Sequence, residues 1–490
     1  MPGTFLIGEK KDRPGTYFRR ENFSNVETAG ATNGIGAAIF QADWGPLNKV
    51  YDMNLTMKND IADYFGRDPH TQILREMFEG GANTIRAIRC GDDDGEPSSV
   101  ILKVNTSSSS ITDADDEETS LTTDAVKIIA AYPGTRAFAV SIRTNLITEL
   151  RECIIYDGTV IFEKVTFEAG NNEAANLIAA LNKASKNFIA EAVGATVPTG
   201  ALATVTQVPM TGGKNPTVTA TSYDRATNQL ERFKWNCLIV DTNNKLVHAL
   251  VQSFVDLSYE MGHFGIGCIA GNSSQDLDER MNLAASYDDE KIAYLLNGWV
   301  SNSGVEYDGY LAAARIGGMI SFFETNSSIT HEVLKSALSL TEPLTNSEII
   351  KAIRKGCLVL SLNDDDQVWI EAAINTLVTL DADMDEGWKK LRRTKCRFEL
   401  MDRINSTCDK LVGKINNDIN GRQTIIATAQ KVLNTMASEK KIMATSYVYE
   451  DPDKLAEGDN AWFKLAIDDI DSLEHIYLTY RFRFSAVNNT

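Results

Sequence analysis

The amino-acid sequence predicts a mixed α/β protein of several domains, and three observations lead to this prediction. Between 223 and 375, continuous apolar segments alternate with amphipathic helical ones, the pattern of a parallel sheet covered on both faces. Residues 96–222 are instead rich in β-branched segments of strand length. The last part, 376–490, begins with amphipathic helices and closes with segments that alternate as strands do.

The composition is that of an ordinary globular protein with an acidic surface. Of the 490 residues, 43% are hydrophobic and 23% are charged, and the net charge is -19. Because polyphosphate repels such a surface, the charge argues against a nucleic-acid partner. The seven cysteines are scattered without a CxxC pair, which favours reduced thiols. Without a signal-peptide core or an apolar run of about 18 residues, we expect synthesis in the cytosol and no membrane insertion.

The first 95 residues are predicted to hold an arm and the first piece of the core. Residues 1–28, around GTYFRREN, lack core-forming periodicity and are expected to form an extended N-terminal arm. Within 29–95, GIGAAIFQADWGPLNKVYD predicts a buried strand followed by a Trp-Gly-Pro turn. TQILREMFEGGA predicts a short helix that ends at its glycines, and TIRAIRC predicts the next strand.

Residues 96–222 are predicted to form an inserted β-sandwich or barrel-like domain. Its expected strands are SVILKVNT, AFAVSIRT, ECIIYDG, VIFEKVTF and PTVTATSY. One helix is expected over 172–190. The acidic stretch SSSSITDADDEETS is interpreted as a solvated loop and not as a metal site.

The segment 223–375 is predicted to be the α/β domain. WNCLIVDT and FGIGCIAG predict buried strands, and KLVHALVQSFVDLSYEMG and DGYLAAARIGGMISFFE predict helices. CLVLSLNDDDQVWIEAAI predicts a hairpin that turns at Asn363 to Asp366.

The segment 376–490 is predicted to be an α+β domain. MDRINSTCDKLVGKI and TIIATAQKVLNTM have helical periodicity, and AWFKLAID and HIYLTYRFRF predict two closing strands. In the final strand, one face is formed by Ile476, Leu478, Tyr480, Phe482 and Phe484. Such a well-formed strand at the end of a chain raises the question of what it pairs with.

No motif in the sequence announces catalysis or a cofactor. MTGGKNPT lacks the first glycine and the hydroxyl of a phosphate-binding loop, and the glycines of GIGCIAG have the wrong spacing for a dinucleotide loop. DADMDEGWKKLR lacks the glycine and the final glutamate of a calcium loop. The five histidines have no ligand spacing, and no Ser lies in a G-x-S-x-G elbow. We therefore predict no catalytic residue, no cofactor and no metal.

One basic cluster, WKKLRRTKCR, stands out in this acidic chain. Its cations are Lys389, Lys390, Arg392, Arg393, Lys395 and Arg397. It is either a solvated helix face or a docking surface for an acidic partner. Nucleic acid is a weaker candidate because no aromatic interleaving or RNA-binding motif accompanies the cluster.

The order of these parts resembles that of contractile phage tail sheath proteins and related contractile particles, over nearly the whole length. The motifs that carry the resemblance are Arg13-Pro14-Gly15-Thr16-Tyr17, Trp44-Gly45-Pro46, Tyr132-Pro133-Gly134 and the aromatic strand that ends at Phe484. The family often has Gly-Asn shortly after Tyr-Pro-Gly, where this chain has Ala137-Phe138.

The resemblance implies a structural protein. The α/β domain would be similar in fold to subtilisin without its catalytic triad. The subunits would form stacked hexameric rings around an inner tail tube, between a baseplate and a tail terminator, and would contract without a nucleotide. The particle would be a virion or another contractile particle assembled in the bacterial cytoplasm.

The resemblance also assigns roles to the arms and to the basic cluster. Both arms would add strands to neighbouring subunits. The six cations of the basic cluster would face the inner tube. The N-terminal strand would comprise Gly15, Thr16, Tyr17, Phe18 and Arg19, and the C-terminal strand the five apolar residues named above. Whether 475–485 is donated or accepts a strand stays open. The alternatives are another self-assembling shell or tube protein, and a cytosolic α/β hydrolase or nucleotide-dependent enzyme with a ligand pocket near Gly265 to Gly271.

Overall fold

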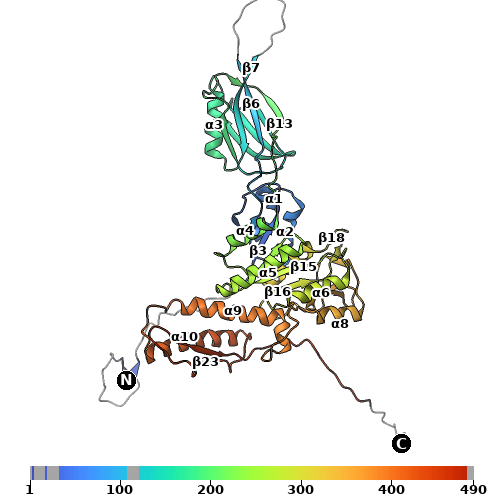
Figure 1. Cartoon of the computed structure of the whole chain (residues 1–490). Helices are drawn as coiled ribbons and strands as arrows, with labels where there is room; N and C mark the ends of the chain where they lie inside the picture. The colour runs from blue at the N-terminus through green and yellow to red at the C-terminus, as the bar shows by residue number, and fades with distance from the viewer. Residues whose placement is uncertain (1–2, 5–16, 19–32, 107–120, 483–490) are drawn as a thin grey trace, which may run out of the picture. The chain divides into compact units, whose positions relative to one another are not determined.

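The computed structural model describes residues 3–4, 17–18, 33–106 and 121–482 (Figure 1). The described chain divides into two compact units. The larger holds 33–399 together with the final segment from Asp469, and the smaller holds Leu400–Asp468. No helix in these described ranges is long and apolar enough to cross a bilayer.

A seven-stranded sheet forms the centre of the larger unit. In spatial order its strands are β20 (Cys357–Leu358), β16 (Ile292–Leu295), β15 (Ile266–Ala270), β14 (Cys237–Val240), β3 (Ile35–Phe40), β5 (Thr84–Arg89) and β4 (Val50–Asn54). All are parallel except β4, which runs antiparallel at one edge. The segments 29–95 and 223–375 therefore contribute strands to one sheet.

Helices cover both faces of this sheet, as the continuous apolar strands predict. On one face lie α4 (Ala220–Leu230), α5 (Lys245–Glu260), α6 (Leu277–Tyr287) and α8 (Asn346–Arg354). On the other face lie α2 (Gln72–Glu79) and α7 (Tyr310–Phe322), which cross closely: a Cβ on Gly80 would lie 2.2 Å from the Arg315 carbonyl oxygen. Glycine is required there because the two backbones touch.

Small elements surround the sheet. They are α1 (Ile61–Phe65), a three-stranded sheet of β17 (Trp299–Ser301), β18 (Glu306–Tyr307) and β19 (Ala337–Leu340), and the hairpin of β21 (Leu360–Leu362) and β22 (Val368–Ile370). The hairpin turns where the sequence predicts, with Asp366 N donating to Asn363 O at 3.0 Å.

The predicted strand PTVTATSY is wrong, because its second half begins helix α4. The Thr219 side chain accepts from the Ser222 backbone, and the Ser222 side chain accepts from the Thr219 backbone, forming a capping box. This cap satisfies the free amides of the first helical turn, and it outweighs the β propensity of the threonines.

The insertion consists of two four-stranded antiparallel sheets packed face to face. One has the order β10 (Val160–Phe167), β9 (Arg151–Asp157), β8 (Phe138–Thr144) and β13 (Val205–Pro209); the other has β11 (Phe188–Ala192), β7 (Leu121–Ala130), β6 (Ser99–Thr106) and β12 (Ala201–Leu202). Both sheets supply residues to one apolar core, for example Val140 and Ile155 from the first and Val126 and Phe188 from the second.

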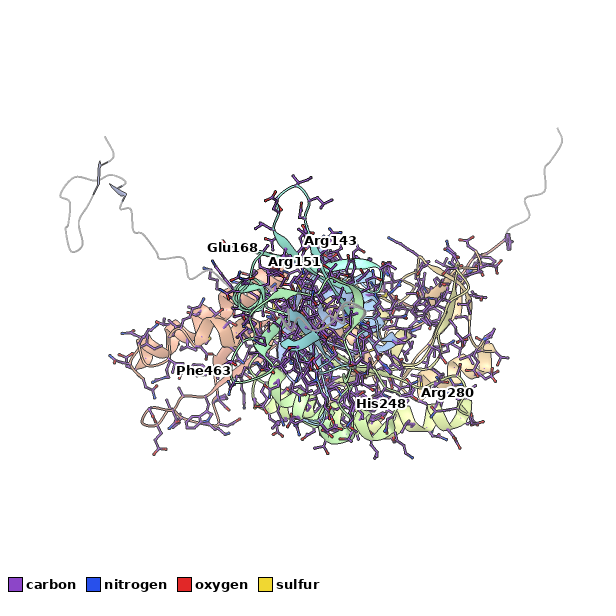
Figure 2. The ribbon with its side chains drawn as sticks, turned by 90° about the horizontal axis from the view of Figure 1, so that it is seen from above. Arg143, Arg151, Glu168, His248, Arg280 and Phe463 are labelled. Carbon is purple, nitrogen blue, oxygen red and sulfur yellow. The ribbon has the colours of Figure 1, made fainter. Side chains whose placement is uncertain are left out.

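The helix expected over 172–190 is shorter in the structure. Helix α3 spans Glu173–Ala184, and Phe188–Ala192 pairs with β7 instead. Arg151, labelled in Figure 2, ties β9 to α3 and β12, because its Nε lies 3.1 Å from Glu173 Oε2 and its Nη2 donates to Leu202 O at 2.6 Å.

The C-terminal part combines helices with a short hairpin. Helix α9 (Leu391–Cys408) is followed by α10 (Ile419–Ser438), β23 (Tyr447–Glu450) and β24 (Phe463–Ala466), and the two strands pair antiparallel. AWFKLAID therefore forms a strand as predicted. Within the described residues, HIYLTYRFRF forms no strand as far as Phe482, and the strand that pairs with β24 is β23.

The division between the units falls later than the predicted domain start at 376. Residues from Thr376 onward remain hydrogen-bonded to the larger unit. Thr376 N donates to Ile292 O at 2.8 Å, and Val378 N donates to Asp288 Oδ1 at 2.7 Å.

Candidate functional site

The C-terminal segment 475–482 carries large apolar side chains that lie in solvent. Ile476, Leu478, Tyr480 and Phe482 are 68%, 84%, 77% and 84% exposed. The segment forms no strand and no hydrogen bond with the rest of the described chain. Exposed apolar rows of this kind mark interaction sites. Phe484, the fifth residue of the predicted face, lies outside the described residues.

The root of this segment, residues 469–474, is in contrast firmly attached to the basic cluster. Lys390 Nζ lies 2.8 Å from Asp471 Oδ2 and 3.1 Å from Glu474 Oε2. Arg393 Nε donates to Asp469 Oδ2 at 2.7 Å. Burial alone would lower the pKa of Lys390, but the hydrogen bonds to the two carboxylates outweigh it and raise the pKa. The same balance raises the pKa of Arg393.

Three of the other cations of the basic cluster also find partners in their own chain. Lys389 Nζ lies 2.8 Å from Glu386 Oε2, and Arg397 pairs with Glu290. The buried Lys395 donates from Nζ to Phe323 O at 2.6 Å and to Ser321 O at 3.1 Å. Arg392 is buried, with 2% of its surface exposed. The cluster is therefore neither a row of free surface cations nor a solvated helix face.

The hairpin β23–β24 in the smaller unit offers a free strand edge at β24. Among the described residues this sheet has two strands, and Tyr447 and Leu465 are 54% and 42% exposed. Helix α10 covers β23 and closes its outer edge: Val448 is buried, its N donates to Gln430 Oε1 at 3.1 Å, and Gln430 Nε2 donates to Ser446 O at 3.0 Å. An unpaired edge with one covered face can accept a further strand.

The predicted N-terminal strand is described only in part. Tyr17–Phe18 pairs in parallel with Gly3–Thr4. Gly15, Thr16 and Arg19 lie outside the described residues, so the pairing of the arm with another subunit stays a prediction.

Two sequence motifs that lie far apart in the chain meet where the insertion joins the sheet. Trp44 packs in the core of the insertion, and its ring centroid lies 5.0 Å from that of Tyr132. Arg89 Nη1 donates to Gly45 O at 2.9 Å and to Pro133 O at 2.7 Å. Gly134 has φ +156, and a Cβ there would lie 1.9 Å from the carbonyl oxygen of the residue before Trp44. The motifs are therefore parts of one junction.

A buried arginine that sequence reasoning missed holds the same junction. The Arg136 guanidinium lies 4.6 to 5.0 Å from the rings of Trp44, Phe138 and Phe162. Its Nη2 donates to Asp157 Oδ2 at 2.8 Å. No local sequence pattern could reveal this, because the rings come from three separate parts of the chain.

A polar network lies at the carboxyl ends of the neighbouring strands β3 and β14. The strand order reverses there, and α/β sheets often bind ligands at such points. Asp241 Oδ1 accepts from Tyr223 OH at 2.5 Å, and Oδ2 accepts from Gln41 N at 2.7 Å. Burial raises the pKa of Asp241 to about 6, although these hydrogen bonds oppose the shift. His70 nearby has a raised pKa because it hydrogen-bonds to Asp68.

The glycines that the enzyme alternative singled out lie against neighbouring side chains. A Cβ on Gly265 would lie 2.2 Å from the Trp235 ring, and one on Gly271 would lie 2.3 Å from Tyr294 OH. These glycines accommodate neighbouring side chains in a crowded sheet.

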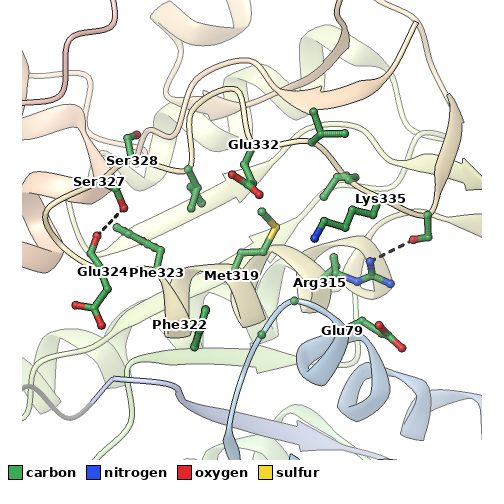
Figure 3. A pocket seen from close by; sticks show the side chains of 16 residues that line it. Glu79, Arg315, Met319, Phe322, Phe323, Glu324, Ser327, Ser328, Glu332 and Lys335 are labelled. Carbon is green, nitrogen blue, oxygen red and sulfur yellow. Dashed lines mark hydrogen bonds between the residues drawn. The ribbon is translucent and has the colours of Figure 1, made fainter. Parts of the chain in front are cut away.

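A cavity of about 560 Å³ lies elsewhere, between the end of α7 and the loop 327–336 (Figure 3). Met319, Phe322 and Phe323 line it, together with Arg315. The guanidinium of Arg315 is already engaged: Nε and Nη2 donate to Glu76 Oε2 at 2.9 and 2.6 Å, and Nη1 donates to Ser336 Oγ at 3.2 Å. Within the described ranges, no group of three or more His, Cys, Asp or Glu residues could hold a metal ion.

Comparison with known proteins identifies the central segment. Residues 217–376 match the family described as phage tail sheath protein central domain. The chain is also 22% identical over 416 residues to the uncharacterized protein YqbK of Bacillus subtilis, covering 82% of this chain and 80% of that protein.

Solved structures share the fold over nearly the whole chain. The sheath tail protein of Desulfitobacterium hafniense has a TM-score of 0.68 at 18% identity, with 93% of this chain and 100% of that one covered. The sheath tail protein Lin1278 of Listeria innocua has a TM-score of 0.64 at 18% identity, covering 90% and 96%. The contracted helical sheath of the anti-feeding prophage has a TM-score of 0.50 at 10% identity, covering 96% and 99%. The resemblance to tail sheath proteins of contractile particles is confirmed.

Proposed function

We propose that this chain is the structural subunit of a contractile tail sheath and that it polymerises by donating its C-terminal strand to a neighbouring copy. The observation that carries the proposal is the exposed row of Ile476, Leu478, Tyr480 and Phe482, which has the alternation of a strand and no partner among the described residues. The tail sheath domain of the central segment supports the same function.

Strand donation has a definite physical basis. An extended segment that joins a free edge gains main-chain hydrogen bonds, and its alternate side chains enter the neighbour's core. The acceptor we propose is the outer edge of β24 in the hairpin β23–β24, which has no strand partner among the described residues. Donor and acceptor are different surfaces, so the contact is heterologous and can propagate through a helical lattice.

The assembly we propose consists of stacked hexameric rings around an inner tail tube, between a baseplate and a tail terminator. Contraction would move the subunits from one lattice packing to a second of lower free energy, which needs no nucleotide. The particle would be a phage virion or a related contractile particle, assembled in the host cytoplasm. The subtilisin-like topology of the α/β domain belongs to the same proposal.

Contact of the basic cluster with the inner tube stays a prediction. Lys389, Lys390, Arg393 and Arg397 each pair with an acid of their own chain. A tube contact would therefore have to break or share those pairs.

The test is negative-stain electron microscopy of the protein expressed alone, compared with a chain that ends at Glu474. The full chain should form striated tubes, and the shortened chain should stay dispersed. A matched control replaces Leu146 and Ile147 with serine, because these residues are 93% and 92% exposed at the tip of the insertion. Closed shells would favour the alternative that this chain is a different self-assembling shell protein. Tubes formed by the shortened chain would rule out the C-terminal strand as the element that connects the subunits.

A further inference from the structure

The basic cluster and the C-terminal strand meet at one place in the larger unit. Residues 469–474 contain three acids, and each pairs with a cation of the cluster: Asp469 with Arg393, and Asp471 and Glu474 with Lys390. Thr330 adds a hydrogen bond from Oγ1 to Glu474 Oε1 at 3.3 Å. After Glu474 the contacts with the described residues stop, and the exposed segment 475–482 begins.

These ion pairs are better shielded than ordinary surface pairs. The side chains of Lys390 and Glu474 are 19% and 16% exposed, whereas those of the surface pair Lys351 and Asp278 are 51% and 61% exposed. Exposed pairs typically contribute little, because solvent and salt screen them and their side chains lose entropy. Half-buried pairs are screened less. The root is therefore held more firmly than a tail lying on the surface.

We propose that Lys390 and Arg393 are positioning residues for the exchanged strand, and that they fix its root so that the strand leaves the larger unit from a set point. The inference rests on the proposed strand donation. It gives the basic cluster an acidic partner in its own chain, the segment 469–474.

The consequence for assembly is a shorter tether. With the root fixed, the strand is free from His475 onward. With the root released, it is free from Asp469, because Asp468 O still accepts from Met443 N at 2.8 Å and Asp468 N still donates to Ser446 Oγ at 3.0 Å. The six additional residues, 469–474, extend the reach by roughly 20 Å, at about 3.3 Å per extended residue. A tether longer than the span lowers the effective concentration of the strand at the neighbouring edge. Release of the root should therefore weaken assembly without altering the strand itself.

The first experiment measures whether the root is fixed. A nitroxide on Leu473→Cys, in a Cys408→Ser background, reports the mobility of the root below the concentration at which tubes form. Leu473 is 80% exposed, so the label displaces no packing. Lys390→Glu should increase the mobility. Lys389→Glu makes the same charge change at a cation that pairs with Glu386, and it should leave the mobility unchanged. Unchanged mobility in Lys390→Glu would overturn the proposal.

The second experiment measures whether the fixed root matters for assembly. Lys390→Glu should raise the protein concentration needed for tubes about tenfold, on the order expected for losing two half-buried contacts. Adding Asp471→Lys and Glu474→Gln to this variant places a cation beside the new glutamate at position 390. The triple variant should regain the low mobility of the root and should assemble at the concentration of the unmodified chain. Increased mobility with unchanged assembly would refute the positioning role. If the chain that ends at Glu474 assembles normally, strand donation fails instead, while the mobility measurement still reports whether the root is held.

Discussion

A lysine at position 478 tests whether assembly depends on one face of the C-terminal strand. Leu478 lies on the same face as Ile476 and Tyr480 and is 84% exposed in the single chain. If a neighbour buries this face, Leu478→Lys places a charged amine in an apolar site. The neighbouring Thr479 points to the other face, so Thr479→Lys makes the same charge change where we expect solvent.

The magnitude follows from the burial that is lost. Complete burial of a leucine side chain stabilises by about 1.5–3 kcal/mol, and most of that is available because Leu478 begins almost fully exposed. A polar group left in an apolar site costs about 1–3 kcal/mol more on the scale of protein mutations. The sum, about 2.5 kcal/mol at the lower end, corresponds to a protein concentration for assembly that is higher by on the order of a hundredfold.

The assay is light scattering against protein concentration, with electron microscopy of each endpoint. Leu478→Lys should need about a hundredfold more protein, and Thr479→Lys should need within about threefold of the unmodified chain. Circular dichroism of the unassembled proteins controls for folding, since both residues are exposed in the described part of the chain. Equal effects of the two substitutions would refute the idea that a neighbour distinguishes the faces of this strand.

Three further predictions concern the larger unit. Arg136→Met should destabilise the insertion by about 2–4 kcal/mol in urea unfolding, because it leaves Asp157 with only a surface partner; a loss below about 1 kcal/mol would contradict the role of this cation. Glu76→Gln leaves the charge of Arg315 buried without its carboxylate and should cost about 3 kcal/mol, measured as a lower midpoint of thermal unfolding; an unchanged midpoint would speak against the pair. The Asp241 pKa of about 6 in the folded state lies above its unfolded value of 3.8, so the folded state binds the proton more tightly. The contribution of this carboxyl to the free energy of unfolding therefore falls as the pH rises from 3.8 to about 6. Asp241→Asn should remove roughly 3 kcal/mol of this fall, and an identical pH profile in the variant would show that this carboxyl does not titrate there.

The elements that sequence alone predicted correctly are those whose signal is local. The buried strands β14 and β15 are continuous apolar runs, and helices α5 and α7 follow helical periodicity over several turns. The hairpin turn at Asn363 to Asp366 depends on adjacent residues in the same way. The threonine-rich start of α4 predicts a strand from its β propensity, but the capping box of Thr219 and Ser222 starts a helix there.

The sequence by itself determined the alternation of the C-terminal strand and the presence of a dense basic cluster. Only the tertiary structure decided that 475–482 has no partner in the part of the chain that the structure describes, and that Lys390 and Arg393 bind the acids at its root. It also brought the motifs at Trp44 and Pro133 together at one junction. The physical reason is that periodicity and capping act between residues a few positions apart, whereas the partner of a charge or a strand edge is set by how distant segments pack.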